Sequence, residues 1–236
     1  MLVVGFPALA FATNCYVVAP ANGEECVVVD PGIGVEGRLE EILSAHGLRP
    51  AAVLLTHGHL DHVFAVTTVC TAHGLAASIH SEDVYRLADP LAMLDPGLVA
   101  MLAQQFGLRS GWQEPAEVVQ LVDGQRLELA GLEIDVVHAP GHTEGSVMFA
   151  LPTVPDGALG DRAGAGTMLT GDVLFAGSIG RTDLPGGDPD AMMRSLAGKV
   201  LPLPDDTLVL PGHGPSTTIG HERRSNPFLL ELAHSA

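Results

Sequence analysis

The chain has 236 residues, with 11 Lys and Arg against 28 Asp and Glu, so its formal net charge is −17. A composition of 47% hydrophobic and 17% charged residues indicates a folded globular protein and excludes an acidic disordered one. The negative charge repels phosphate backbones, which argues against nucleic acid as a partner. The 11 histidines equal the Lys and Arg residues in number, an abundance that needs an explanation.

The N-terminal apolar segment, residues 1–12, is too short to span a membrane and contains Gly5 and Pro7. Its Ala8-Leu9-Ala10 is similar to a signal cleavage site, but no basic residue precedes it. We therefore expect this segment to form the first strand of a cytoplasmic protein that does not bind membranes.

Apolar β-branched runs alternate along the chain with helical spacing of apolar residues. One helix is expected from Val35 to Gly47, and a second is expected to follow His62 and to end at Gly74. Asp188-Pro189 is typical of a helix N-cap followed by proline in the first turn. The predicted strands after the first are 26–29, 52–55, 134–137, 146–149 and 207–210.

This mixture predicts an α/β (α+β) protein in which helices cover sheets, rather than a purely parallel sheet. Residues 126–151 are mostly strand, interrupted by turns. Residues 152–166, rich in Gly and Pro, are expected to form an exposed loop whose role the sequence leaves open. A chain of this length can form one large domain or two small ones, and it contains no repeat or low-complexity segment.

The most specific motif is Thr56-His57-Gly58-His59-Leu60-Asp61-His62, directly after an apolar strand. Three imidazoles and a carboxylate this close together are costly to bury without hydrogen bonds or a metal ion. Nitrogen and oxygen donors suit Zn²⁺, Fe or Mn, and four crowded donors could serve two ions.

Further donors stand at other predicted strand ends, each beside a glycine. Glycine allows a sharp turn, so that the neighbouring side chain projects from the edge of a sheet. One such donor would mean little, but the repeated arrangement is specific. The additional candidates are His142 after Pro140-Gly141, Asp172 after Thr170-Gly171, and His213 within Pro211-Gly212-His213-Gly214.

These motifs resemble those of the metallo-β-lactamase superfamily over essentially the whole chain. The resemblance implies that residues 1–236 form one domain, a four-layer αββα sandwich. It also implies two divalent metal ions at one edge of the sheets, zinc first and iron or manganese as alternatives. Asp172 stands where many true β-lactamases carry cysteine, which argues against that activity. The resemblance further implies that His57, His59 and His142 bind the first ion, that Asp61, His62 and His213 bind the second, and that Asp172 bridges them.

The match is closer to the glyoxalase II group, particularly its short bacterial members. It rests on residues 171–175 (GDVLF), 180–183 (GRTD), 211–214 (PGHG) and 222–227 (ERRSNP). The resemblance implies hydrolysis of a thioester, an S-2-hydroxyacyl derivative of glutathione or another small thiol, with Asp61 and Asp172 orienting the attacking hydroxide. Full-length glyoxalase II adds a helical glutathione-binding domain, whereas 23 residues follow His213 and Lys199 is the single lysine. We therefore leave the thiol and the oligomeric state open.

Two other activities of the superfamily stay open: a persulfide dioxygenase with one iron and a comparable GRTD segment, and a lactonase. Arg181 and Asp183 of that segment are candidates for the substrate groove, with pairing to each other as the favoured alternative. A non-catalytic module would be expected to have lost ligands, and a nuclease to carry a basic arm; the sequence shows neither.

The remaining polar residues have structural interpretations. His46 and His73 are expected at helix ends, where imidazole can interact with unpaired carbonyl groups. Asp30 is expected to stabilise a turn, although a similar Asp-Pro-Gly segment lies near the site in this superfamily. His138 is expected to make a strand-end hydrogen bond or to contact His142. Turn, surface or helix-anchoring roles are expected for His80, His221, His234, Arg223 and Arg224.

Overall fold

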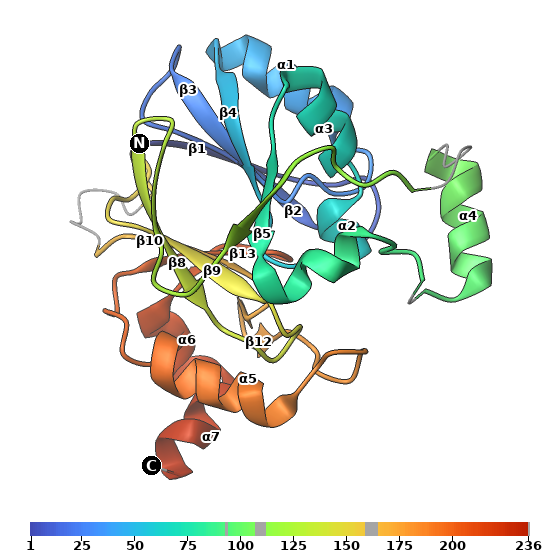
Figure 1. Cartoon of the computed structure of the whole chain (residues 1–236). Coiled ribbons are helices and arrows are strands. Elements are labelled where there is room, and N and C mark those ends of the chain that lie inside the picture. Colours follow the sequence, from blue (N-terminus) through green and yellow to red (C-terminus); the bar gives the residue numbers. More distant parts are fainter. Residues whose placement is uncertain (93, 107–111, 159–164, 236) are drawn as a thin grey trace.

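Two six-stranded sheets pack face to face and carry helices on their outer surfaces (Figure 1). The computed structural model describes residues 1–92, 94–106, 112–158 and 165–235, with side chains up to residue 233. The first sheet contains, in this order, β1 (Leu2–Pro7), β2 (Asn14–Ala19), β3 (Glu25–Val29), β4 (Arg49–Leu54), β5 (Ala77–His80) and β6 (Val118–Leu121). The second contains β14 (Thr217–Thr218), β13 (Leu208–Pro211), β10 (Thr167–Gly171), β9 (Val147–Leu151), β8 (Leu132–His138) and β7 (Arg126–Leu129).

Strand β2 shows why the sheets are covered on both faces. Successive side chains of a strand point to opposite faces. Cys15 and Val17 pack in the core under the outer helices, whereas Tyr16 and Val18 pack between the two sheets. The expected four-layer αββα sandwich is therefore confirmed.

The helices of each outer layer follow the sequence signals closely. On the first sheet lie α1 (Glu36–His46) and α3 (Val66–His73), and Gly47 ends α1 with a φ of +64°. On the second lie α5 (Pro189–Ser195), the π-helical turn η2 (Leu196–Val200), α6 (Ile219–Ser225) and α7 (Pro227–Ser235). The Asp188 carboxylate accepts a hydrogen bond from the Ala191 amide, which confirms the predicted N-cap.

Three local features differ from the sequence prediction or add to it. The helix expected after His62 is divided, because a short α2 (Leu60–Val63) already includes that residue and α3 begins separately. Two further helices, the 3-10 helix η1 (Ser81–Leu87) and α4 (Pro96–Phe106), lie between β5 and β6, and a two-stranded hairpin joins β11 (Leu174–Phe175) to β12 (Ser178–Ile179). Of the predicted loop 152–166, residues 152–158 are exposed or half-buried and residues 159–164 lie outside the described chain.

The topology brings the ends of several strands to one edge of the sandwich. β3 and β4 are parallel, as are β10 and β13, so the segments that follow β4, β10 and β13 leave at related sheet ends. The turns need unusual backbone conformations at glycine, with a φ of +140° at Gly141 and +47° at Gly171. In the described chain, no helix combines the length and apolar character that a membrane span requires.

Candidate metal centre

All seven candidate ligands lie together at this edge. His57 and His59 follow β4, His142 is in the β8–β9 loop, Asp172 follows β10, and His213 follows β13. Asp61 and His62 lie on α2, so the crowded motif places its donors partly on a loop and partly on a helical turn. Residues from five parts of the fold thus form one cluster.

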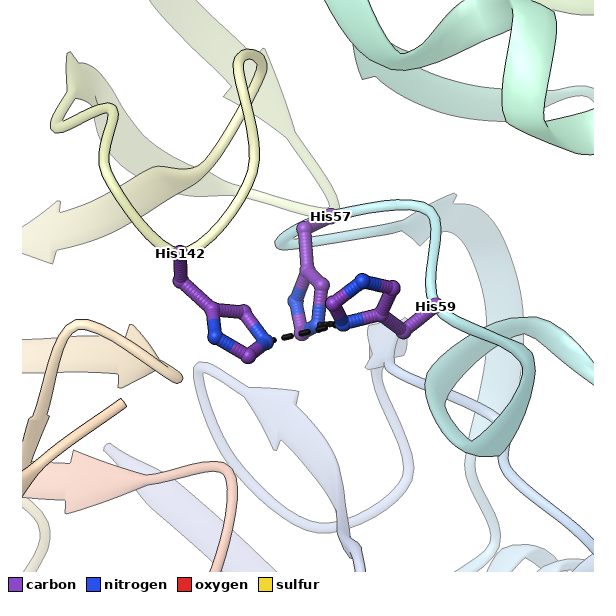
Figure 2. Close-up of side chains that lie close together, drawn as sticks. All are labelled: His57, His59 and His142. Atoms are coloured by element: carbon purple, nitrogen blue, oxygen red, sulfur yellow. Dashed lines mark hydrogen bonds between the residues drawn. The ribbon is translucent and has the colours of Figure 1, made fainter. Parts of the chain in front are cut away.

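The first group of donors consists of His57, His59 and His142. Figure 2 shows their rings pointing towards one another, with His59 Nδ1 lying 3.1 Å from His57 Nε2 and 2.8 Å from His142 Nε2. Zn–N distances are about 2.0–2.1 Å, so a small cation between three such nitrogens is compatible with this spacing.

The second group consists of Asp61, His62 and His213, with Asp172 next to both groups. His213 Nε2 lies 3.2 Å and His62 Nε2 3.6 Å from Asp61 Oδ2. Asp172 directs Oδ1 to His62 Nε2 at 3.3 Å, while its Oδ2 lies 3.5 Å from both His142 Nε2 and His213 Nε2. One carboxylate is therefore within reach of both groups.

The buried polar atoms of the cluster indicate that a cation belongs there. His57 and His62 are fully buried, and Asp172 is buried as well. Among the described residues, His62 Nε2 and Asp172 Oδ1 are buried without a hydrogen-bond partner. Leaving such groups unpaired is costly, whereas a divalent ion would satisfy both. The donor set of imidazoles and carboxylates fits Zn²⁺, Fe or Mn.

Electrostatics differ between the two groups. Burial lowers the pKa of His59 to about 3, with His142 adding to the shift, and burial also lowers the pKa of His57 well below its usual value. These rings are neutral, the form that binds a metal ion. Burial opposes a charge on His62 too, but the neighbouring carboxylates, Asp172 first, raise its pKa well above the usual value. The second group therefore favours positive charge.

Asp30 orients two of the ligands instead of merely stabilising a turn. Its Oδ2 accepts from His62 Nδ1 at 2.9 Å and from Thr56 Oγ1 at 2.6 Å. Because the Thr56 hydroxyl donates to Asp30, its oxygen can accept from His57 Nδ1, which lies 3.1 Å away. Both histidines thus turn Nε2 towards the cluster, so the turn interpretation of Asp30 is wrong.

His142 is oriented in a similar way by the segment around Arg181. The His142 Nδ1 donates to the Arg181 backbone carbonyl at 2.7 Å, which leaves Nε2 for the cluster. The Arg181 side chain forms a bidentate pair with Asp183, at 2.7 and 2.8 Å, as the favoured interpretation predicted. Arg181 also lines the cavity beside the cluster, so both expectations for it describe part of its position.

The sequence did not reveal a buried carboxylate that links the loops of the first group. Asp83 is fully buried and accepts hydrogen bonds from the Gly58 amide at 2.8 Å and from the Gly145 amide at 2.9 Å. It also accepts from Thr143 Oγ1 at 2.8 Å and from Arg86 Nε at 3.2 Å. Thr13, also unpredicted, donates to Asp61 Oδ2 at 2.7 Å.

The other histidines have mainly structural contacts. His46 and His73 end α1 and α3 as expected, but their rings contact Asn22 and Glu40 side chains rather than helix carbonyls. His138 makes the expected strand-end hydrogen bond, with Nε2 lying 2.8 Å from the Glu144 carbonyl oxygen. His80 accepts from the Glu82 amide at the start of η1, and His221 is exposed on α6. Arg223 donates to the carbonyls of Leu201 and Leu203, and Arg224 pairs with Asp205. The His234 side chain lies outside the described part of the chain.

A cavity of about 440 Å³ adjoins the cluster. His59, Asp61, His142, Asp172 and His213 contribute one part of its lining. Apolar side chains and Arg181 contribute most of the rest. A small molecule in this cavity can therefore reach both groups of donors.

Comparison with known proteins agrees with the fold. Residues 8–213 match the family model described as the metallo-beta-lactamase superfamily, and the chain belongs to that superfamily. Hydroxyacylglutathione hydrolase GloC of Haemophilus influenzae is 35% identical over 94% of this chain and 95% of its own length. The probable metallo-hydrolase YqgX of Bacillus subtilis is 34% identical over 88% and 89%, respectively.

Solved structures show the same architecture. The B3 metallo-beta-lactamase BLEG-1 is 35% identical, with a TM-score of 0.76 over 97% of this chain and 99% of its own. TTHA1623, in a di-iron-bound form, is 38% identical, with a TM-score of 0.73 over 97% and 100%. ETHE1 from Myxococcus xanthus, with a TM-score of 0.73 over 100% and 91% of the two chains, shares the fold at 21% identity.

Proposed function

We propose that the chain is a dinuclear metal-dependent thioester hydrolase of the glyoxalase II type. The observation that carries this proposal is the pair of donor groups that share Asp172, beside a cavity open to a small molecule. The hydroxyacylglutathione hydrolase relative supports thioester chemistry. The substrate is an S-2-hydroxyacyl derivative of glutathione or of another small thiol.

In this proposal each donor group holds one divalent ion, zinc first and iron or manganese as alternatives. Two ions bound there would lower the pKa of a water molecule towards neutrality and polarise a carbonyl group. Asp61 and Asp172 would accept hydrogen bonds from that water and would orient it towards the thioester carbon. His57, His59, His142, His62 and His213 complete the ligand set.

Water is the proposed nucleophile because the described lining of the cavity offers no hydroxyl or thiol side chain, and its carboxylates and imidazoles belong to the proposed ligand set. It contains no serine, threonine or cysteine. Addition of water to the carbonyl carbon and cleavage of the C–S bond give a carboxylic acid and a thiol. A thiol has a pKa of about 8.5, so it can leave without a dedicated general acid.

The test combines metal quantification with turnover. We expect two ions per chain and hydrolysis of S-lactoylglutathione or another acyl thiol, followed by release of the free thiol. Chelator-treated protein should be inactive. The control variant Asp135→Asn removes a carboxylate at a partly exposed position on β8, outside both donor groups, and should behave like the wild type. Oxygen consumption that depends on glutathione persulfide, with one iron per chain, would favour the persulfide dioxygenase and contradict this proposal.

A further inference from the structure

One side of the cavity is apolar and has no part in the proposed hydrolysis. Its six side chains, called here the apolar wall, are Phe11, Pro90, Leu94, Leu98, Leu184 and Pro185. They come from the β1–β2 loop, from the segment leading into and through the start of α4, and from the segment after β12. Apolar residues that converge from three segments on one cavity form a patch, which is characteristic of a binding surface.

The wall is fixed to the element that carries two candidate ligands. Leu102 of α4 is 1% exposed and packs with Ile33 and with Leu60. Leu98 packs against the same cluster, and Leu60 directly precedes Asp61 on α2. Buried packing therefore sets the distance between the α4 side of the wall and the candidate ligands on α2.

Apart from the proposed metal ions, the described lining of the cavity offers few cationic side chains for an anionic carrier. Among its described lining residues, Arg181 is the one Lys or Arg. Two of its nitrogens already donate to Asp183, at 2.7 and 2.8 Å. A thiol with several carboxylates would need to displace this pair, whereas an apolar group would release water from the wall and from itself.

We propose that the apolar wall binds an apolar arm of the substrate, an alkyl or aryl group next to the thioester. This inference rests on the proposed function and narrows its substrates to thioesters with such a group on the acyl or the thiol side. Phe11 is 51% exposed, so its ring has surface to bury against the arm. Each buried methylene should raise kcat/KM by about fourfold until the wall is covered.

Two series of thioesters test the proposal on metal-loaded protein. In one, N-acetylcysteamine carries acetyl, butyryl, hexanoyl or octanoyl groups; in the other, acetate is esterified to ethane-, butane-, hexane- or octanethiol. A rise in kcat/KM of about fourfold per methylene along either series supports the proposal and identifies the side of the arm. Hydrolysis at the same kcat/KM along both series overturns it.

Binding of the products separates this inference from the proposed function. Calorimetric titration with n-alkyl carboxylates and n-alkyl thiols measures the affinity of the apolar wall for an alkyl chain without turnover. If affinity rises with chain length in a protein that hydrolyses none of the thioesters, the proposed binding role of the wall is supported and only the proposed thioesterase activity is refuted. Affinity that is independent of chain length in both series overturns the wall.

Variants link the chain-length effect to named residues. Phe11→Asn removes the ring, and asparagine tolerates the left-handed backbone of this position, where φ is +60°. Phe11→Asn and Leu94→Asn should each reduce the increase in kcat/KM along the thioester series to less than about twofold per methylene. Met101→Gln is the matched control, because Met101 is 51% exposed on α4 and is not part of the wall. An unchanged increase in Phe11→Asn would contradict the proposal.

Discussion

Replacing Asp172 tests whether the two donor groups share a carboxylate. Its Oδ1 lies 3.3 Å from His62 of the second group, and its Oδ2 lies 3.5 Å from both His142 of the first group and His213 of the second. We expect Asp172→Ala to retain one metal ion and to lose activity by about a hundredfold or more, because a shared carboxylate holds both ions in register. Metal content and kcat/KM, measured on the same preparation, check this prediction.

The matched control for Asp172→Ala is Asp135→Ala. Asp135 pairs with Arg126 on the surface of the second sheet, away from the cavity, so two ions and full activity should remain. If Asp172→Ala keeps both ions and full activity, the carboxylate does not bridge the groups.

The grouping of the seven candidate ligands could be predicted from the sequence, whereas most of the residues that orient them could not. His57, His142 and His213 follow strands in recognisable glycine-containing motifs. Thr13 and Asp83 belong to no such motif, and the contacts that matter join residues 48 and 25 positions apart in the chain. Such contacts depend on how the loops meet in three dimensions, which local spacing does not encode.

The helix η1 joins the loops of the first donor group through Asp83. This carboxylate accepts from the amides of Gly58, between two ligands, and of Gly145, three residues after His142. Asp83→Asn replaces one accepting oxygen with a donor, so we expect metal affinity to fall by about ten- to a hundredfold while the second group is less affected. Competition with a chelator, on protein whose folded state is verified by circular dichroism, measures the affinity.

The control for Asp83→Asn is Asp135→Asn, which removes an exposed charge of the same kind. Asp83→Asn should also lower kcat/KM less at saturating metal than at limiting metal, because the substitution weakens metal binding. Wild-type affinity in a folded Asp83→Asn protein would show that η1 does not position the ligand loops.

The contact between the ends of β5 and β8 should respond to pH. His80 stacks on His138, with ring centroids 4.0 Å apart, and burial followed by the charge of His138 lowers the pKa of His80. Glu82, Asp83 and Asp123 oppose this shift without reversing it. The unfolded chain therefore binds the His80 proton first as the pH falls, so this contact loses stability below the ordinary histidine pKa of about 6.5.

We expect His80→Asn to reduce the loss of unfolding free energy between pH 7 and pH 5, by at most about 1.4 kcal/mol per pH unit. Asparagine can still accept from the Glu82 amide at the start of η1. Urea unfolding at several pH values, with His221→Asn as an exposed control on α6, measures the difference. Parallel pH profiles of His80→Asn and wild type would contradict the role of the stack.

Elements with a full apolar pattern could be predicted better than those without one. α1 places Leu39, Ile42 and Leu43 in the core and ends at a glycine, so its boundaries follow the sequence. In β6 only Leu121 is buried, and β14 has two residues, so neither shows a complete strand pattern. The start of α2 at Leu60 could not be predicted either, because this single turn has only two apolar residues, Leu60 and Val63, on either side of two candidate ligands.

At the scale of the whole molecule, the cluster connects the two sheets. His57 and His59 leave the first sheet, whereas His142, Asp172 and His213 leave the second. The strand and helix patterns predict sheets covered by helices, whereas the αββα architecture is predicted from the family resemblance. The distance between the sheets at this edge could not be predicted. The buried Tyr16 hydroxyl donates to the Pro211 carbonyl and so joins the sheets through two residues that are 195 positions apart in the chain.

Metal ions bound between the sheets should therefore stabilise the entire fold. Only the folded chain brings the donors together, so metal at 100 times its dissociation constant should add about 2.7 kcal/mol per site to the free energy of unfolding. For a chain of this size, that raises Tm by about 5–10 °C per site, or about 10–20 °C with both ions bound. Thermal unfolding of chelator-treated protein, with and without Zn²⁺, measures the shift, which should be about halved in Asp172→Ala and complete in Asp135→Ala. An unchanged Tm, in protein shown by elemental analysis to hold the metal, would mean that the ions bind the unfolded chain equally well or lie outside the cluster.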